Sequence, residues 1–393
     1  MSLGKPEKEQ KGTGIYTSWG YVPLDLCCTA MPENLIVNFA PASLSSSSSS
    51  GSSSSSSSSG AGGASTSKKR NDHGDGGGGG AGNGRALVGA AHLDTFLIHE
   101  VNTDPTKEFA SKHVHSIHLP SALQNRCIIF RAKWVSLPKP YSVKVLVLCT
   151  NLATYFYNEL GSKQIFKFEY EGDDADLSRC CRTIGATKAN ILLGSERGEL
   201  HVFSYEPRKG NIVPSRTLKL STEPIAELCA RRNGLLVVGS PSGALSVWTI
   251  SQGDPLKLTE YVLCKPETIT SIVLWSPYAI VAYGSGIIRM FNLFEKAIVA
   301  QIFAHSRWIS CMDVCTSANL LLTMGEDDEA RIWSLRRRQK GEQRSPIKLQ
   351  STIQIEDMNL IGGRFLNTQG TVLGACNLGN KDIAVYVGED CKR

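Results

Sequence analysis

Histidines and carboxylates are the residues in this sequence whose types and spacing could support metal or acid–base chemistry. His113, His115 and His118 lie close together, and in a strand the first two would share a face. No neighbouring Cys or carboxylate completes a ligand set, so an ordinary strand or loop is favoured. Residues 171–176 are rich in carboxylates but lack the spacing and the closing Glu of a calcium loop, which favours a solvated turn.

The 12 cysteines are scattered and contain no C-x-x-C pair. Cys311 and Cys315 come nearest to a pair, but along one strand they would lie about 13 Å apart. Many cysteines stand in apolar runs, where a free thiol behaves as a small hydrophobe. We therefore expect no metal site, reduced thiols and a cytoplasmic location, with nuclear or vesicle-associated pools as alternatives. The charged start of the sequence shows no apolar signal region, which agrees with that expectation.

Motifs for covalent catalysis or phosphate binding are missing from the sequence. Residues 76–80 are all glycine, but no strand precedes them and no Lys-Ser/Thr follows, so they do not form a phosphate loop. Neither G-x-S-x-G nor H-E-x-x-H occurs. We expect no catalytic residue, no cofactor and no enzyme activity. A hydrolase with a dispersed catalytic constellation is an alternative for which the sequence nominates no residue.

The strongest charge feature is a basic stretch over residues 336–348, which begins with Arg336, Arg337 and Arg338. A solvated loop between two structural units is the simplest interpretation. An acidic lipid head group or a nucleic acid is the functional alternative, although the stretch has no aromatic residues to stack on bases. The net charge of the whole chain is only +6, which does not demand such a partner.

The elements that must position these residues are short strands. Residues 304–335 read as three strands, Ile309 to Val314, Leu320 to Met324 and Glu329 to Leu335, joined by tight turns. The second of these strands is continuously apolar, as expected of a strand that is buried on both faces.

This unit recurs along the sequence as an apolar strand, a turn that usually contains Gly, an alternating strand and a closing aromatic residue. The closing aromatics are Tyr157, Phe203, Trp248, Phe291, Trp333 and Tyr386. Their spacings are 46, 45, 43, 42 and 53 residues. A period near 43 with four strands per unit is typical of β-propeller blades, because one blade cannot cover its own faces.

The 304–335 unit resembles a WD repeat. Ala304-His305 stands where that family has Gly-His, and Thr323, Asp327 and Trp333 stand at its Ser/Thr, Asp and Trp positions. The resemblance implies that His305, Thr323, Asp327 and Trp333 form a buried chain of hydrogen bonds with a structural role. The other units lack the Gly-His, and several replace the Trp.

The sequence therefore predicts an all-β fold, a single seven-bladed propeller of the WD-repeat type with a disordered Ser/Gly-rich insertion. The predicted parts are a disordered tail (1–20), N-terminal strands that join the propeller (21–42), a Ser/Gly-rich loop (43–84), the propeller (85–388) and a C-terminal tail (389–393).

The Ser/Gly-rich loop is expected to lie within the first blade, with a linker as the alternative. We expect Leu35 to Phe39 or Leu24 to Cys28 to close the ring, and residues 353–387 to complete the seventh blade.

The resemblance and the missing catalytic motifs favour a non-catalytic scaffold whose partners are other proteins. Arg307, Trp308 and Glu326 adjoin the tetrad and are candidate partner-binding residues, because Trp and Arg are favoured at interfaces. Packing of Trp308 between blades is the alternative. Arg336, Arg337 and Arg338 are the candidates for the acidic-ligand function.

Overall fold

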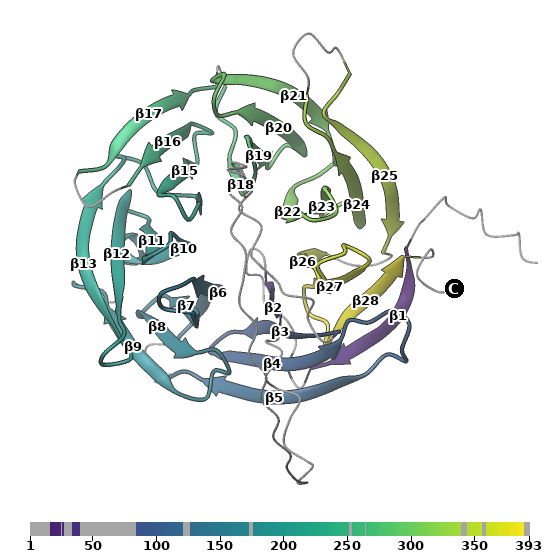
Figure 1. The fold of residues 1–393 in the computed structure, drawn as a ribbon, viewed down its shortest axis with the longest axis horizontal. Helices are drawn as coiled ribbons and strands as arrows, with labels where there is room; N and C mark the ends of the chain where they lie inside the picture. Colours follow the sequence, from purple (N-terminus) through teal and green to yellow (C-terminus); the bar gives the residue numbers. More distant parts are fainter. Residues whose placement is uncertain are drawn as a thin grey trace, which may run out of the picture.

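The computed structural model describes residues 16–24, 26, 34–39, 84–120, 126–172, 176–250, 254–263, 265–338, 344–355 and 359–388. In these residues the strands form seven four-stranded antiparallel sheets that stand radially around a central axis (Figure 1). This confirms the predicted all-β, seven-bladed propeller. The predicted disorder of residues 1–15, 43–83 and 389–393 concerns positions outside the described residues.

Blades one to four are built, from inner to outer strand, as follows. Blade one contains β2 (Leu35–Phe39), β3 (Arg85–His92), β4 (Thr95–Asn102) and β5 (Ser111–His118). Blade two contains β6 (Ile129–Leu137), β7 (Val143–Thr150), β8 (Ala153–Asn158) and β9 (Gln164–Glu169). Blade three contains β10 (Cys181–Ala186), β11 (Asn190–Ser195), β12 (Glu199–Glu206) and β13 (Asn211–Lys219), and the 3₁₀ turn η2 (Leu177–Arg179) precedes it. Blade four contains β14 (Glu227–Ala230), β15 (Leu235–Gly239), β16 (Leu245–Thr249) and β17 (Leu256–Tyr261).

Blades five to seven continue the ring. Blade five contains β18 (Ile269–Trp275), β19 (Tyr278–Tyr283), β20 (Ile287–Asn292) and β21 (Ala297–Phe303). Blade six contains β22 (Ile309–Cys315), β23 (Leu320–Gly325), β24 (Glu329–Leu335) and β25 (Ile347–Gln354). Blade seven contains β26 (Leu360–Phe365), β27 (Val372–Asn377), β28 (Asp382–Gly388) and β1 (Tyr16–Pro23).

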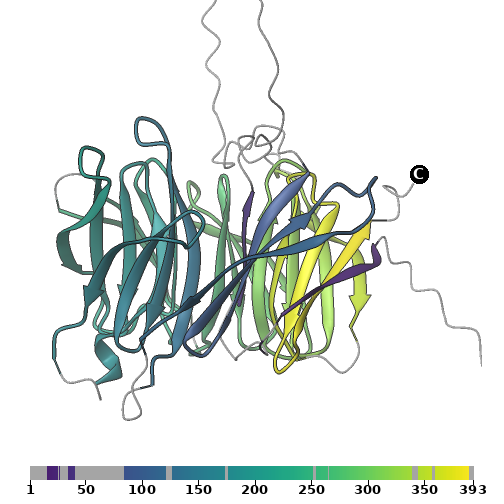
Figure 2. The same ribbon diagram turned by 90° about the horizontal axis from the view of Figure 1, so that it is seen from below.

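The core lies between the blades, because the second strand of each blade is apolar on both faces. Every residue of β19 is buried, for example. The repeated aromatic residue lies in the second half of the third strand and packs against the neighbouring sheet, as Phe203 of blade three does against Phe156 of blade two at 5.2 Å between ring centroids. The seven sheets therefore cover one another, as the period predicts (Figure 2).

The strand that closes the ring differs from both predicted candidates. β1 pairs antiparallel with β28 from Tyr16↔Gly388 to Pro23↔Asp382, so the predicted disordered tail (1–20) overlaps a strand. Leu35 to Phe39 is instead the inner strand of blade one, and only part of 24–28 lies among the described residues. β1 contains Gly20 and ends at Pro23, two residue types that are rare within strands, so its pattern gave little strand signal, but the open edge of β28 requires a partner.

The Ser/Gly-rich stretch connects two paired strands. β2 and β3 pair from Leu35↔Ala90 to Phe39↔Ala86, so residues 40–84 join neighbouring strands of blade one. This agrees with an insertion within the first blade and contradicts the alternative of a linker between a tail and the domain. A long insertion is tolerated there because the entropy of loop closure grows only logarithmically with length.

Two predicted boundaries near blade six are wrong. β25 pairs with β24, so the basic stretch between Leu335 and Ile347 joins the third and fourth strands of one blade, not two blades. Ile353 consequently belongs to blade six, and blade seven begins at Leu360. The closing aromatic marks the third strand, whereas the outer fourth strand is half-exposed and has a weak pattern.

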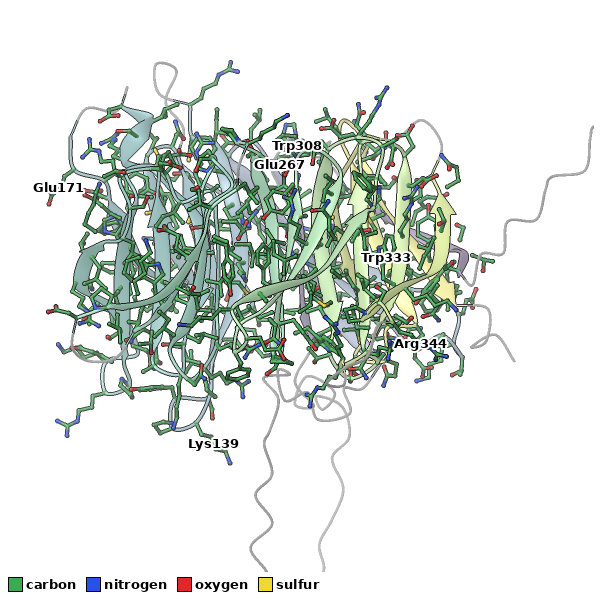
Figure 3. All side chains as sticks on the ribbon, turned by 90° about the horizontal axis from the view of Figure 1, so that it is seen from above. Lys139, Glu171, Glu267, Trp308, Trp333 and Arg344 are labelled. Carbon is green, nitrogen blue, oxygen red and sulfur yellow. The ribbon has the colours of Figure 1, made fainter. Side chains whose placement is uncertain are left out.

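The strand order defines two ends of the propeller. The turns between second and third strands and the loops that enter each inner strand lie at one end, which we call the tetrad face. The turns between first and second and between third and fourth strands lie at the other end. Figure 3 shows Trp308 and Glu267 at the tetrad face and Lys139 and Arg344 at the opposite one. No helix among the described residues is long and apolar enough to cross a membrane.

Candidate interaction surfaces

The four tetrad residues form one continuous chain of hydrogen bonds in blade six. His305 Nδ1 lies 2.7 Å from Asp327 Oδ1, and His305 Nε2 lies 2.8 Å from Thr323 Oγ1. Trp333 Nε1 donates to the same hydroxyl at 2.9 Å. The chain links the entering loop, β23, the following turn and β24; Asp327 is half-buried and the other three residues are buried.

The direction of this chain follows from the protonation of His305. Burial lowers the pKa of His305 below its ordinary value, although the hydrogen bond with Asp327 opposes that shift. Burial acts to raise the pKa of Asp327, but hydrogen bonds from His305 and the Ser306 amide outweigh it and hold that pKa low. A neutral His305 therefore donates a hydrogen bond from Nδ1 to the Asp327 carboxylate. Its Nε2 accepts a hydrogen bond from the Thr323 hydroxyl.

In other blades, different residues link the turn between the second and third strands to the loop that enters the inner strand. In blade three Arg197 donates to Asp176 at 2.5 Å and to Ser178 at 3.2 Å. In blade five Ser285 donates to Glu267, whose second carboxylate oxygen accepts from Arg289 at 2.6 Å.

Blades two and four also have side-chain links between this turn and the entering loop. In blade two the Asn151 side chain accepts from the Ile128 amide at 2.7 Å and donates to the Arg126 carbonyl at 2.9 Å. In blade four hydrogen bonds from Ser242 and Ser240 hold the pKa of Glu223 below its ordinary value, against a small effect of burial. The tetrad motif does not reveal these links because the motif specifies residue types. The fold needs only a hydrogen-bond donor that faces an acceptor.

Trp308 lies on the tetrad face where blades five and six meet. Its ring packs against Gly284, where an added Cβ would come within 2.3 Å of Trp308 Cζ3. The side chain nevertheless keeps 41% of its surface exposed. Part of the Trp308 ring thus packs against blade five and the rest faces solvent, and its role in partner binding stays a prediction.

Charged groups surround this tryptophan. Arg307 precedes it and is exposed, and the Glu326 amide donates to the Trp308 carbonyl at 2.9 Å. Glu267 and Ser285 lie beside Gly284 and bring a carboxylate from blade five. We name Arg307, Trp308, Glu326, Glu267 and Ser285 the Trp308 surface.

The predicted basic residues lie at the end opposite to the Trp308 surface. Arg337 and Arg338 are exposed, whereas Arg336 is half-buried and donates from Nε to the Ser345 carbonyl at 3.2 Å. The backbone amide of Arg338 donates to the Tyr278 hydroxyl at 3.1 Å. The six candidate partner-binding residues therefore divide between two faces and cannot form one site.

The turns at this opposite end carry an excess of basic residues. The basic residues described there are Lys107, Lys139, Lys163, Lys188, Arg208, Lys209, Arg231, Arg232, Lys296, Arg336, Arg337, Arg338 and Arg344. The acidic residues described there are Asp104, Glu108, Glu159, Asp254 and Glu295. We call this end the basic face. At the tetrad face the described turns and loops hold more acidic than basic residues.

The remaining candidates for chemistry are not brought together. Among the described residues no group of three or more His, Cys, Asp or Glu could hold a metal ion. His113 and His118 lie on the outer strand β5 and contact Ser116 at 2.9 Å and Thr95 at 3.1 Å. Two hollows of about 420 and 310 Å³ are lined by described residues; neither His nor Asp lines them, and the second is lined by Glu223 and Glu260.

Comparison with known sequences extends over most of the propeller. The model of the WDR54 family matches residues 107–386, from the loop before β5 to β28. WD repeat-containing protein 54 of Mus musculus is 27% identical over 254 residues, which cover 62% of this chain and 74% of the mouse protein.

Solved structures agree in fold. A chain in the crystal structure of the Mitotic Checkpoint Complex has a TM-score of 0.63 and 11% identity, covering 98% of this chain and 95% of that chain. The WD40 β-propeller domain of Doa1 has a TM-score of 0.59 and 8% identity, covering 96% of this chain and 98% of that domain. At these identities the likeness concerns architecture alone.

Proposed function

The chain belongs to the WDR54 family of WD-repeat proteins, and on that premise we propose that it is a non-catalytic scaffold that binds partner proteins through the Trp308 surface. The observation that carries this proposal is an exposed tryptophan in a loop that hydrogen bonds fix to the facing turn. In blades three and five the loops are also fixed to turns by hydrogen bonds, so much of the tetrad face is pre-organised.

The composition of the Trp308 surface suits protein recognition. Interface hot spots are enriched in Trp and Arg, and they consist of an apolar anchor inside a polar rim. Trp308 supplies the anchor, while Arg307 and Glu326 supply rim charges of both signs. A partner segment with an apolar side chain flanked by charged groups would fit this arrangement.

Affinity purification of the full chain followed by mass spectrometry tests the proposal. The first variant is Trp308→Ala. The charge reversals Arg307→Glu and Glu326→Lys are the other two, and both keep the Trp308 ring that packs on Gly284. Phe294→Ala is the matched control, because Phe294 is an aromatic residue with 78% of its surface exposed on the basic face. Thermal unfolding of each variant checks that the propeller remains folded.

We expect a defined set of partners to bind wild type and the control, and to be depleted at least several-fold with Trp308→Ala. Hot-spot tryptophans typically contribute about 2 kcal/mol or more to binding, which is roughly a 30-fold change in affinity. Equal recovery of every partner by folded Trp308→Ala and wild type would contradict this docking face.

A second candidate function is an adaptor that binds acidic lipid head groups or nucleic acid through residues 336–348. The observation that favours it is that Arg337 and Arg338 are exposed on a face where other basic turns gather. Binding to anionic vesicles or to single-stranded RNA should then fall steeply with salt and with Arg337→Gln/Arg338→Gln. Binding that is absent, or insensitive to salt, would rule the adaptor out.

We also propose a cytoplasmic location, with nuclear or vesicle-associated pools as alternatives. Cys149, Cys180, Cys181 and Cys315 are free thiols, and burial raises the pKa of Cys149 to about 12, which keeps that thiol protonated. Such thiols suit a reducing compartment. Imaging of a fluorescent fusion expressed at native level, together with fractionation, would test the location.

A further inference from the structure

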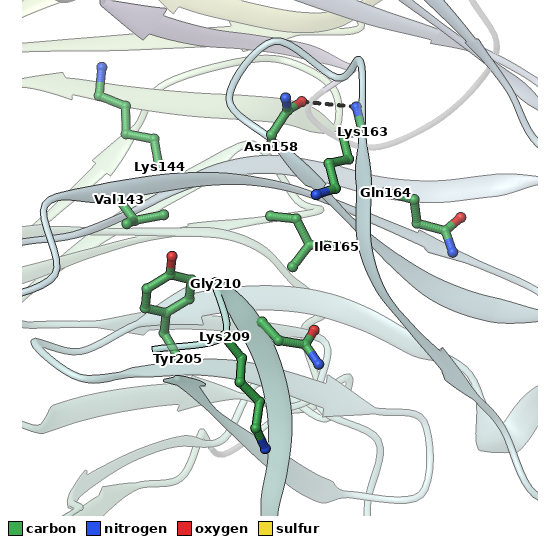
Figure 4. A pocket seen from close by; sticks show the side chains of 10 residues that line it. Val143, Lys144, Asn158, Lys163, Gln164, Ile165, Tyr205, Lys209 and Gly210 are labelled. Atoms are coloured by element: carbon green, nitrogen blue, oxygen red, sulfur yellow. Dashed lines mark hydrogen bonds between the residues drawn. The ribbon is translucent and has the colours of Figure 1, made fainter. Parts of the chain in front are cut away.

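A groove of about 420 Å³ lies on the basic face between blades two and three, and no acidic residue lines it (Figure 4). Its lining includes Lys144, Lys163 and Lys209 together with the Tyr205 hydroxyl and the Asn158 amide. We call it the lysine groove. Glu159 and Glu206 offset much of the charge of Lys144 and Lys209, so Lys163 supplies most of the positive potential that attracts anions to this hollow.

Lys163 is the ammonium group best placed to hold a ligand. Figure 4 shows its side chain crossing the groove, while the turn that carries it is fixed by the Lys163 amide donating to Asn158 Oδ1 at 3.2 Å. Lys144 and Lys209 lie at the two ends and pair with Glu159 at 3.1 Å and Glu206 at 3.2 Å. Among the ion pairs between described residues none involves Lys163, so its charge is open to an incoming anion.

The chemistry of the lining favours a phosphate monoester. Lys ammonium groups bind phosphate oxygens as point charges, and neutral hydroxyl and amide donors complete the shell of a tetrahedral anion. Tyr205 Oη and Asn158 Nδ2 are donors of this kind, and Tyr205 is steadied by an edge-on contact with Tyr141 at 6.0 Å between ring centroids.

One segment of this chain begins beside the groove. Lys144 Nζ donates to the Phe39 carbonyl and to Asn38 Oδ1, each at 2.7 Å, so the end of β2 is held against the groove wall. The sequence from 43 to 59 follows four residues later, and it is serine at every position except Leu44 and Gly51. An extended chain spans about 3.5 Å per residue, so these serines can reach the groove.

We propose that the lysine groove binds phosphoserines of residues 43–59 in the same chain. A Ser/Thr protein kinase would transfer the γ-phosphoryl group of ATP to a serine Oγ, with release of ADP and of the hydroxyl proton. Each phosphate adds a charge of about −1.5 to −2. Because the segment is tethered beside the groove, its effective concentration is in the millimolar range.

The consequence of this docking is regulatory. Phosphoserines held by Lys163 neutralise part of the positive charge that blades two and three present on the basic face. An acidic partner of the basic face would then meet a smaller positive surface. This inference does not depend on the Trp308 surface, which lies at the other end of the propeller.

Fluorescence anisotropy with the unphosphorylated full chain tests the groove. The probe is a labelled peptide of residues 43–50 that carries phosphoserine at positions 46 and 48, and the same peptide without phosphate is the reference. Lys163→Gln/Lys209→Gln and Tyr205→Phe alter the groove. Lys139→Gln/Lys296→Gln is the matched control, because these lysines lie on the same face but do not line the groove.

We expect the phosphopeptide to bind wild type and control equally, and the groove lysine variant to bind at least 10-fold more weakly. Tyr205→Phe should cause a smaller loss at unchanged thermal stability. Equal loss in the control, equal binding of the unphosphorylated peptide, or displacement by inorganic phosphate alone at the concentration of the peptide would overturn the assignment.

Docking within the same chain has a separate readout. Full-length protein phosphorylated on residues 43–59 should bind the labelled phosphopeptide at least several-fold more weakly than unmodified protein, because its groove is occupied. Unchanged binding by that protein would overturn docking in cis. Binding of phosphatidylserine vesicles that is abolished by the groove variants but unaffected by phosphopeptide would instead assign the groove to a membrane and overturn the proposal.

Discussion

Thr323 is the residue on which the tetrad depends, because its hydroxyl both accepts and donates. It accepts from Trp333 Nε1 and lies within hydrogen-bonding distance of His305 Nε2, and the side chain has no exposed surface. A buried group that loses its partner cannot turn to water instead, so the cost of removing the hydroxyl falls on both neighbours.

Thr323→Val should therefore destabilise the protein strongly, although it conserves shape. It leaves Trp333 Nε1–H and His305 Nε2 without a partner, at about 1–3 kcal/mol for each group. Urea unfolding measures the loss, and Thr352→Val, at a half-buried position of the same blade, is the control. A loss no greater than that of the control would show that the tetrad contributes nothing to stability.

The lowered pKa of His305 predicts how stability depends on pH. The unfolded chain binds the proton near the ordinary pKa of about 6.5, whereas the folded chain binds it only at lower pH. The free energy of unfolding should thus fall as pH drops below about 6.5 and level off below the pKa of the folded state. His201, whose pKa burial also lowers, acts in the same direction.

Comparison with His305→Gln isolates this contribution. Unfolding free energies from pH 7.5 to 5.0 should decline less in the variant than in wild type. Parallel decline of the two proteins would mean that His305 keeps an ordinary pKa in the folded state.

At the scale of elements, β1 decides whether the ring is closed. It covers the edge of β28, and its Tyr16 hydroxyl donates to the Gly370 carbonyl while Val22 is buried in the core between blades one and seven. An uncovered edge strand offers unpaired backbone groups to other chains.

Removal of residues 1–23 should lower the thermal unfolding temperature and promote association, whereas removal of residues 1–14 should leave both nearly unchanged. Differential scanning calorimetry and light scattering check the two truncations side by side. Similar stability of the longer truncation and the full chain would imply that β1 contributes little to ring closure.

At the scale of the whole molecule, the two ends of the propeller differ in charge. The tetrad face presents carboxylates around Trp308, and the basic face presents turns rich in Lys and Arg. One rigid body thus offers surfaces of opposite sign, and electrostatic complementarity selects partners and speeds their encounter. The two ends of the propeller thus suit ligands of different charge.

A buried ion pair ties non-adjacent blades together. Arg131 on β6 of blade two donates to Glu227 on β14 of blade four, two blades further round the ring. Each side chain is only 5% exposed. The loss of one partner leaves the other charge buried, which costs more than the pair itself contributes.

Arg131→Leu should accordingly cost about 3–5 kcal/mol, and Arg131→Leu/Glu227→Leu should recover much of that loss. A double-mutant cycle by urea unfolding gives both values. Strictly additive losses would contradict the coupling between blades two and four.

Local pattern was enough to predict the repeat and the closing aromatics, and the resemblance of one unit to a WD repeat indicated the four tetrad residues. A strand that is buried on both faces must be apolar, and tight turns favour Gly and Asp. These features are local, so they can be recognised within the length of a single blade, about 40 residues. His305, Thr323, Asp327 and Trp333 were found because one blade keeps the residue types of the motif.

Only the tertiary structure decided the closure of the ring, the links in the other blades and the distribution of charge. β1 meets β28 across more than 350 residues, and no local signal specifies a pairing at that distance. The lysine groove likewise joins residues of two blades. In blades three and five, Arg197 and Glu267 form the hydrogen bonds between turn and entering loop, although neither residue matches the tetrad motif. Sequence fixes which residues prefer to be strands, whereas packing around the axis determines which side chains meet.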